Sequence, residues 1–381
     1  MRTVRLLVVL SAMVGLGAGA EDRQDFVYRP ASVSFFPPLS TNGMEGRRVS
    51  TSFSLNVIGG YLGRLQGAEL GGVFNIEEDD ARWYQAAGVF NIVGNGFAGL
   101  QQAGAVNIVG GDVNAVQMAG AVNVAGERLF GSQFAGAVNL TGAAAHGLQV
   151  AGGVNIAGQG IRGTQVAGGV NIAGGLVSGL QLAGGVNIAE EFAGCQVGVV
   201  NIAGKGEGLQ LWVVNIAEDV DIPIGLISIV EHGQFHVNAW ASEFSLVNVG
   251  IKTGSRIIYN VFSVGYQPDG DSSRLFAAIG IGGHIPMNRF FLDIDGVYYS
   301  PRTGPDWFEE KGSDVLTGIR LNAGWQVTDY LAVTAGPTFS VWVSDRSDGS
   351  GIPFYNAPLF HSEGDVNVRI WPGFNVGLQL L

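Results

Sequence analysis

The fold of this chain is decided by the stretch Gly147-Leu148-Gln149-Val150-Ala151-Gly152-Gly153-Val154-Asn155-Ile156-Ala157-Gly158, because close copies of it recur along the sequence. A short fixed period indicates one structural unit that is stacked many times along an axis. We therefore expect residues 66–217 to form an array of ten repeats. The asparagine of the phrase recurs with a step of 16 residues, and then with a step of 14, as a structural ladder at Asn75, Asn91, Asn107, Asn123, Asn139, Asn155, Asn171, Asn187, Asn201 and Asn215.

Each copy divides into two hexads that share the pattern glycine, apolar, amide, apolar, alanine, glycine. Such a hexad reads as a very short strand between glycine corners. Side chains alternate between the two faces of a strand. The pattern therefore favours a parallel β-solenoid in which the aliphatic residues of successive copies form the interior. The aliphatic residues in question are Leu148, Val150, Val154 and Ile156, with Gln149 and Asn155 on the opposite face.

An alternative reading joins both hexads into one strand of ten residues, with the aliphatic residues facing lipid and the amides lining a pore. That pattern also suits one large transmembrane β-barrel that includes the repeats. The 14-residue copies favour the solenoid, because the spacing from Gln196 to Asn201 is one residue shorter than in the other copies. This change would turn half of a continuous strand to the wrong face, whereas a corner between two strands absorbs it.

The C-terminal region, residues 218–381, has a different pattern with long alternating segments and many aromatic residues. Apolar and polar residues alternate over residues 319–327, 331–343 and 366–380, and the first two segments meet at a turn at Thr328-Asp329. Strands of about ten residues with this alternation are typical of outer-membrane β-barrels. The sequence therefore predicts an all-β chain with a small antiparallel barrel of eight to ten strands after the solenoid. A soluble β-sandwich is the alternative for this region.

The N-terminus resembles a secretory signal peptide over residues 1–20, with Arg2 and Arg5, an apolar run and the small residues Ala18-Gly19-Ala20. We expect residues 21–65 to form a strand or a cap on the repeats. No run of 18 apolar residues follows, which excludes helical membrane spans. The formal net charge of −12 argues against nucleic acid as a partner.

The ordered set of motifs resembles a family of bacterial surface-repeat proteins of the outer membrane of diderm bacteria. The resemblance covers nearly all of the chain after residue 20 and rests on the repeats and on later motifs, namely residues 222–228, Glu231-His232-Gly233, Lys252-Thr253-Gly254, Tyr259-Asn260 and Ala335-Gly336-Pro337. It implies an exported protein at the cell surface with outer-membrane lipid as a partner, and it carries no catalytic residues to this chain.

The sequence contains short patterns that resemble nucleotide-binding and metal-binding motifs, but each lacks the neighbouring structure or ligands that such a site needs. Two stretches, Gly94–Gly99 and Gly158–Gly163, match a dinucleotide-binding glycine pattern, yet both are connectors without a following helix. The pair His232 and His236 lacks a third metal ligand, and Asp269-Gly270-Asp271 and residues 345–349 lack a full calcium series. Asp293 and Asp295 share one strand face, which in a barrel places them in the lumen.

A single cysteine, Cys195, excludes an intrachain disulfide and stands where other copies carry leucine, so we expect a buried thiol. We expect no catalytic, cofactor-binding or metal site. The predicted function is a non-enzymatic surface protein with a structural or adhesive role, whose connectors form an acidic rim for an extracellular protein or glycan. The alternative is an outer-membrane pore or transport barrel with an amide-lined lumen.

Overall fold

The computed structural model describes residues 25–268, 273–303, 314–344, 359–362 and 367–381. The predicted signal peptide and the two incomplete calcium stretches, Asp269-Gly270-Asp271 and residues 345–349, lie outside these residues. The chain divides into two compact units, Met1–Trp212 and Val213–Leu381, and the division falls within strand β20 (Val200–Val230).

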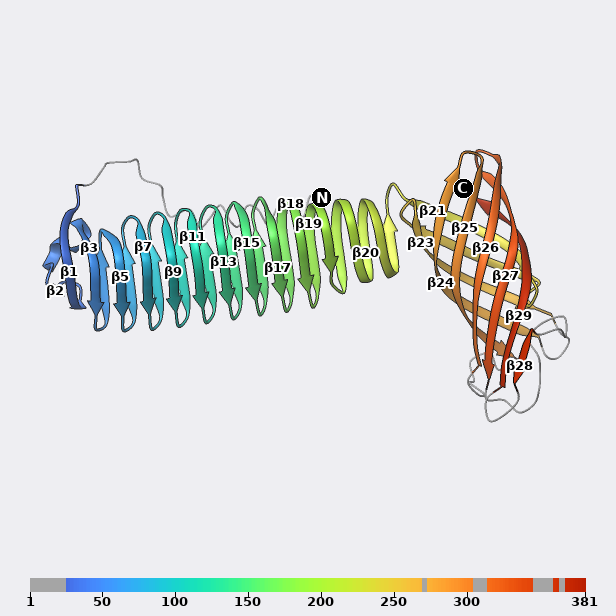
Figure 1. Cartoon of the computed structure of the whole chain (residues 1–381), viewed down its shortest axis with the longest axis horizontal. Coiled ribbons are helices and arrows are strands. Elements are labelled where there is room, and N and C mark those ends of the chain that lie inside the picture. The colour runs from blue at the N-terminus through green and yellow to red at the C-terminus, as the bar shows by residue number, and fades with distance from the viewer. Residues whose placement is uncertain (1–24, 269–272, 304–313, 345–358, 363–366) are drawn as a thin grey trace. The chain divides into compact units, whose positions relative to one another are not determined.

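The first unit is a parallel β-solenoid of about ten turns, as the repeat predicted (Figure 1). Most turns contain one longer strand and one short strand. The longer strands are β5 (Arg64–Gly71), β7 (Ala81–Ala87), β9 (Phe97–Ala103), β11 (Val113–Ala119), β13 (Leu129–Ala135), β15 (Ala144–Ala151) and β17 (Gly160–Ala167). The short strands are β4 (Gly59–Leu62), β6 (Phe74–Glu77), β8 (Phe90–Val93), β10 (Val106–Val109), β12 (Val122–Ala125), β14 (Val138–Thr141) and β16 (Val154–Ala157). In β18 (Val170–Ala183), β19 (Val186–Val197) and β20 the two strands of a turn are continuous.

The strand register places like residues of successive turns side by side. Gln149 pairs with Gln165, and Asn155 pairs with Asn171. The shorter copies keep both columns, because Asn187 still pairs with Asn201 and Gln196 with Gln210. The corner between the hexads therefore absorbs the shorter spacing, and the alternative of one large barrel that includes the repeats is wrong.

The structure reverses the predicted faces of the repeat. Gln149 and Asn155 are completely buried, whereas Leu148, Val150, Val154 and Ile156 are only partly buried on the outside. The prediction of an aliphatic interior is thus wrong for these columns. The physical reason is that amides stacked at the strand spacing satisfy one another, so small alanines and paired amides fill a thin interior without leaving a polar group unbonded. Buried aliphatic and aromatic residues come instead from a connector column that includes Leu129, Ala145, Ile161, Val177 and Phe192.

Residues 25–65 cap the array, which is one of the roles expected of them. Strand β1 (Val27–Phe36) pairs in parallel with β3 (Val49–Asn56), and β3 pairs in parallel with β5. Strand β2 (Leu39–Ser40) folds back against β1, and a 3-10 helix, η2 (Gly43–Arg48), follows it. These elements form the end of the solenoid that precedes the first repeat.

The two neighbouring glycines at the corner between the hexads, Gly152 and Gly153, differ in the room available to a side chain. A β-carbon on Gly152 would lie 2.2 Å from the carbonyl oxygen of Gly136, whereas one on Gly153 would lie 2.8 Å from that of Ala137. The preceding turn already carries an alanine, Ala137, at the position of Gly153. We expect Gly152→Ala to destabilise the array by about 1–3 kcal/mol through overpacking, and Gly153→Ala to cost less. Urea unfolding of both variants measures this difference, and equal losses would contradict it.

The second unit contains a closed antiparallel barrel of eight strands, and the alternative of a soluble β-sandwich is wrong. In chain order these strands are β21 (Gln234–Ser242), β22 (Val247–Gly254), β23 (Ile258–Gln267), β24 (Arg274–Met287), β25 (Phe290–Thr303), β26 (Asp314–Thr328), β27 (Leu331–Ser344) and β29 (Asn367–Leu380). The pairing of β29 with β21 closes the barrel, and the short β28 (Phe360–Ser362) pairs with β29. The predicted turn at Thr328-Asp329 joins β26 to β27.

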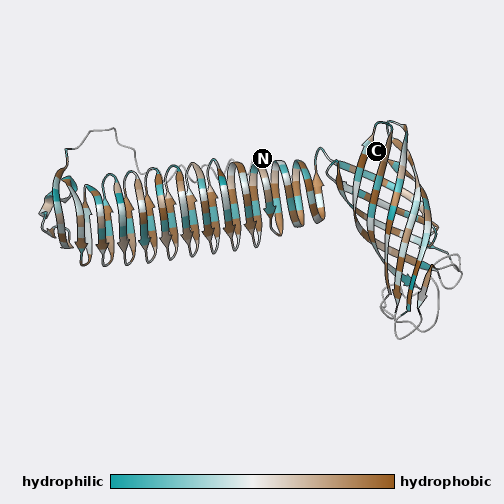
Figure 2. Ribbon diagram, in the orientation of Figure 1, coloured by the Kyte–Doolittle hydropathy of each residue, from teal (hydrophilic) through white to brown (hydrophobic). Residues whose placement is uncertain are grey.

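Hydrophobic and hydrophilic residues alternate along the barrel strands (Figure 2), and the burial of their side chains places the apolar ones outside and the polar ones inside. On β25, Ile294 is 41% exposed while its neighbours Asp293 and Asp295 are at most 1% exposed. On β26, Leu321 is exposed and Asn322 is buried. The predicted alternation over residues 319–327 is thus confirmed, and it continues in β27 and β29.

Candidate functional site: amide ladders and the barrel interior

The predicted asparagine ladder exists and runs through the solenoid interior. The Nδ2 atom of each asparagine donates to the Oδ1 atom of the next one along the chain, over 2.9–3.0 Å, from Asn56 through to Asn201. The same nitrogen also donates to a backbone carbonyl, as Asn155 does to Val166 over 2.8 Å. The last predicted member, Asn215, is also completely buried. The ladder is therefore a structural core and is closed to ligands.

A second ladder of glutamines runs beside it in the opposite direction. Each Nε2 atom donates to the Oε1 atom of the preceding glutamine over 2.7–2.9 Å, from Gln210 back to Gln85. The amide dipoles of the two ladders therefore oppose each other. Since the amides bond to one another inside the solenoid, the predicted amide-lined barrel lumen is not found.

Two buried glutamates, Glu69 and Glu77, lie at the N-terminal end of the array, and Glu69 takes the place of a ladder glutamine. Glu69 pairs with Gln85 in the register and accepts hydrogen bonds from Asn56 over 2.7 Å and from Gln85 over 3.2 Å. A glutamate has no NH2 group that needs a preceding acceptor, so it ends the glutamine ladder without an unbonded donor. The column position of Glu77 holds Val93 in the next turn.

Glu77 is an acid in a site without a cation. It is 1% exposed; one of its oxygens accepts a hydrogen bond from Gln85, and the other oxygen, Oε1, has no partner. Burial, and secondarily the charge of Glu69, raise the pKa of Glu77 well above its ordinary value. Sequence reasoning missed both residues, although the break in the glutamine and valine columns was a visible signal.

The charged connectors of the array form an exposed rim, as expected. Arg128 and Asp112, one turn apart, form an ion pair of 2.6 Å. The hydrogen bond from Arg128 holds the pKa of Asp112 below its usual value. Exposed ion pairs of this kind contribute little to stability. The charged side chains of the rim can therefore give up these pairs for contacts with another molecule at little cost.

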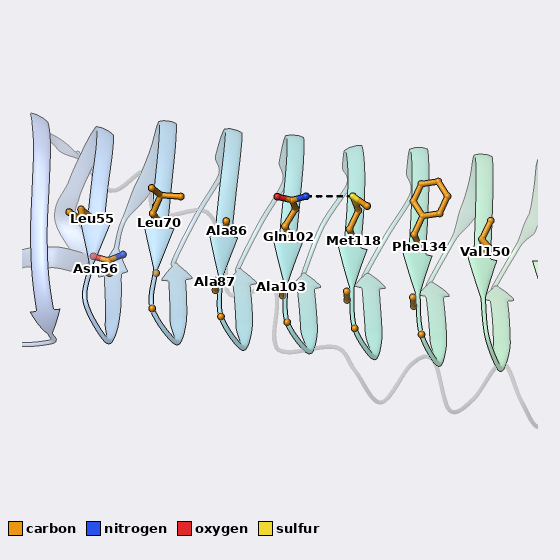
Figure 3. A pocket seen from close by; sticks show the side chains of 18 residues that line it. Leu55, Asn56, Leu70, Ala86, Ala87, Gln102, Ala103, Met118, Phe134 and Val150 are labelled. Carbon is orange, nitrogen blue, oxygen red and sulfur yellow. Dashed lines mark hydrogen bonds between the residues drawn. The ribbon is translucent and has the colours of Figure 1, made fainter.

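An apolar groove runs along the outside of the first repeats (Figure 3). It has a volume of about 940 Å³. Small alanine and glycine residues of the corners form part of its lining, beside one column of larger side chains from successive turns, namely Leu55, Leu70, Ala86, Gln102, Met118, Phe134 and Val150. This groove is a direct consequence of the reversed faces, because the amide columns occupy the interior.

Lys252, Asp293 and His284 form a bonded cluster inside the barrel. Lys252 Nζ lies 2.6 Å from Asp293 Oδ2, and His284 Nδ1 lies 2.7 Å from Asp293 Oδ1. The three residues come from β22, β25 and β24. The charge of Asp293 is thus compensated inside the barrel, as a buried carboxylate requires.

Asp295 forms a second cluster with partners from two further strands. It accepts hydrogen bonds from Tyr259 over 2.5 Å, from Arg320 over 2.8 Å and from Asn322 over 3.3 Å. The prediction that Asp293 and Asp295 face the barrel interior is confirmed. Both carboxylates are saturated with partners from neighbouring strands, which is an arrangement that fastens strands together.

The histidine pair and the glycine patterns noted in the sequence do not form a site in the structure. His232 is exposed and its Nδ1 contacts the Glu218 carbonyl oxygen, whereas His236 accepts a hydrogen bond from Gln379. Within the described residues, no group of three or more histidine, cysteine or acidic side chains is placed to hold a metal. The glycine patterns Gly94–Gly99 and Gly158–Gly163 run from a connector into the strands β9 and β17.

Cys195 is half-buried rather than fully buried, because its leucine column lies on the outer face. The remaining burial still raises the pKa of its thiol. This lowers the thiolate fraction at neutral pH and disfavours a reactive role.

Among the described residues, no helical segment has the length and apolar character needed to cross a membrane. No known family model matches the chain, and neither a curated protein nor a solved structure shows a significant similarity to it.

Proposed function

We propose that this chain is a non-enzymatic outer-membrane protein whose barrel lies in lipid and whose repeat array offers a surface for binding or adhesion. One observation carries the proposal: a closed barrel presents apolar side chains outward and bonded polar side chains inward. Isoleucine, leucine and phenylalanine on the outside, such as Ile281, Leu321 and Phe374, are 40–58% exposed. A water-soluble barrel would place polar residues there.

Aromatic residues at one end of the barrel support the same proposal. Phe235, Phe290, Trp325 and Tyr330 are 51–75% exposed. They lie near the turns β24–β25 and β26–β27 and near the start of β21, which the antiparallel pairing puts at one end. Transmembrane barrels carry aromatic girdles at the membrane interfaces. Strands β24 to β27 have 14 or 15 residues, more than the 9–11 that a tilted strand needs to span a bilayer.

The barrel interior favours an anchor over a transport pore. Eight strands enclose a space that side chains fill, and the clusters around Asp293 and Asp295 link side chains from different strands across this space. The array, with its exposed charged rim and apolar groove, is then the part that meets a partner.

The lipid-facing role of the barrel predicts a position-dependent effect of arginine. Leu321→Arg places a charge in the middle of β26 and is expected to lower the stability of the lipid-inserted barrel by about 2–4 kcal/mol. Tyr330→Arg, at the β26–β27 turn, is the matched control and should cost at most about 1 kcal/mol. Folding into phosphatidylcholine vesicles, followed by urea titration, measures both variants.

Two results would overturn the membrane role. One is a chain that stays folded and monomeric in water without lipid or detergent. The other is an equal loss of stability in both arginine variants.

A further inference from the structure

The cap of the array contains a half-open pocket that the amide ladders do not fill. The β1–β2 hairpin, helix η2 and the strands β3 and β4 surround a space of about 420 Å³, which we call the tip pocket. Ligand pockets in proteins have volumes of about 300–1,000 Å³. A single bridging water takes up only about 30 Å³, so the space is larger than structural hydration of the cap needs.

Buried neutral polar side chains form one wall of the tip pocket. Ser32, Ser34, Asn42 and Asn56 line it and are 2–5% exposed. Asn42 is held from both sides: its Nδ2 donates to Ser32 Oγ over 2.8 Å, and its Oδ1 accepts from Arg29 over 2.9 Å. Ser34 Oγ donates to the Gly59 carbonyl oxygen over 2.9 Å. The wall is therefore pre-organised.

This wall retains hydrogen-bonding capacity toward the cavity. Ser32 Oγ accepts from Asn42, which leaves its own hydroxyl hydrogen to donate. Ser34 donates its hydrogen, which leaves its lone pairs to accept. A ligand that both donates and accepts at neighbouring positions matches these two hydroxyls.

The rest of the lining is apolar or has its charge compensated. Pro37, Pro38 and Leu62 supply apolar surface. Arg47, the one charged residue among the described lining residues, lies 3.3 Å from Glu78 and stacks 4.6 Å from the centre of the Tyr61 ring. An anion would meet Glu78 together with Arg47, so the pocket favours a neutral ligand.

We propose that the tip pocket binds one neutral sugar residue of a glycan. Sugar hydroxyls donate and accept at once, as the serine wall requires, and the C–H face of a pyranose ring packs on apolar surface such as the prolines and the tyrosine. The proposal deepens the surface-binding function proposed above, and it rests on that function only in assuming that the glycan comes from outside the cell. The binding site itself is inferred from the cavity and from the hydrogen bonds of its wall.

Consecutive layers of the cap offer a matched pair of variants. Ser32 pairs with Ser54 in the register, but Ser32 lines the pocket and Ser54 does not. Ser32→Ala removes one hydrogen bond to the sugar, which is worth about 1 kcal/mol and corresponds to roughly fivefold weaker binding. Ser54→Ala removes a hydrogen bond to Asn56 of 3.2 Å but no hydrogen bond to the sugar, so it should leave the affinity nearly unchanged. Ser40→Phe, on the half-exposed β2, fills the cavity and should abolish binding.

The test uses the full chain in detergent micelles and the methyl glycosides of glucose, galactose, mannose and N-acetylglucosamine as probes. Saturation-transfer NMR detects binding and a titration gives the dissociation constant, with thermal unfolding as a check on each variant. We expect at least one glycoside to bind. Its affinity should fall in the Ser32→Ala and Ser40→Phe variants and not in the Ser54→Ala variant. Absence of binding by all four, equal effects of Ser32→Ala and Ser54→Ala, or unchanged binding in a folded Ser40→Phe variant would overturn the proposal.

The lipid test separates this proposal from the membrane role. A chain that inserts into vesicles but binds no glycoside contradicts the tip-pocket proposal alone. A chain that binds a glycoside in the expected way but needs no lipid contradicts the membrane role alone.

Discussion

Replacing Glu77 with valine is expected to stabilise the N-terminal turns of the array at neutral pH and to remove most of their pH dependence. Valine is the residue that the next turn carries at this position, Val93, and it is buried there. Glu77 by contrast buries a carboxyl group beside Glu69, with one oxygen that has no partner. A buried unsatisfied polar group costs about 1–3 kcal/mol, and a charged one costs more.

The direction of the pH effect follows from the raised pKa of Glu77. The folded array retains the proton of Glu77 at pH values where the unfolded chain, with an ordinary pKa near 4.5, has lost it. Stability from this group is therefore fully present below about pH 4.5 and declines as the pH rises through the folded-state pKa. The Glu77→Val variant should lack this decline.

Hydrogen exchange of the strands β5, β6 and β7 between pH 4.5 and 9 measures the effect locally. Glu77→Gln is the control that keeps an amide partner for Gln85 and removes the titration, so it should also flatten the pH profile. Glu78→Gln, at a neighbouring residue outside the buried core, should leave the profile of these strands as in the natural chain. A Glu77→Val profile as steep as the natural one would contradict the assignment.

The repeated phrase made the solenoid predictable from the sequence. The alternation of apolar and polar residues along the C-terminal segments made the barrel predictable. The step of 16 residues gave the register, so that Gln149 pairs with Gln165 as stacking requires. The alternation around Leu321 and Asn322 was correct because only one face of a barrel strand meets the outside. Both predictions used a period that the backbone geometry imposes.

The choice of the inward face of the repeat could not be made from the period alone. Alternation separates Asn155 from Ile156 but does not say which of the two is buried. The general preference of aliphatic residues for the interior gave the wrong answer. Here each amide finds its partner in the next turn, and this contact depends on the 16-residue register. The available signal was that the same amide residue recurs at these positions from one repeat to the next. A column of exposed residues would tolerate variation, so this recurrence indicates burial.

The tip pocket and the glutamate pair were missed for another reason. Both lie where the repeat ends, and a pattern derived from the middle copies says nothing about its ends. Glu69 and Glu77 are visible in the sequence only as exceptions to the glutamine and valine columns. The pocket depends on how the β1–β2 hairpin folds over the first turn, which no periodicity encodes.

The reversed faces predict that Asn155→Ala destabilises the array more than Ile156→Ala does, although the second change removes more apolar surface. Asn155 donates to Asn171 over 2.9 Å and to the carbonyl oxygens of Gln149 and Val166, and it accepts from Asn139 over 3.0 Å. The truncation leaves several buried groups unbonded, at about 1–3 kcal/mol each. We expect a loss of about 3 kcal/mol or more.

Ile156 is the matched control, because it neighbours Asn155 in β16 and is only partly buried on the outside. Truncating a fully buried isoleucine costs about 2–5 kcal/mol, and a half-exposed one should cost about 1 kcal/mol. Urea unfolding of both variants, followed by hydrogen exchange in β14 to β18, compares the two faces directly. A larger loss from Ile156→Ala would mean that the aliphatic columns face the interior, and it would contradict the amide ladders as the core of the array.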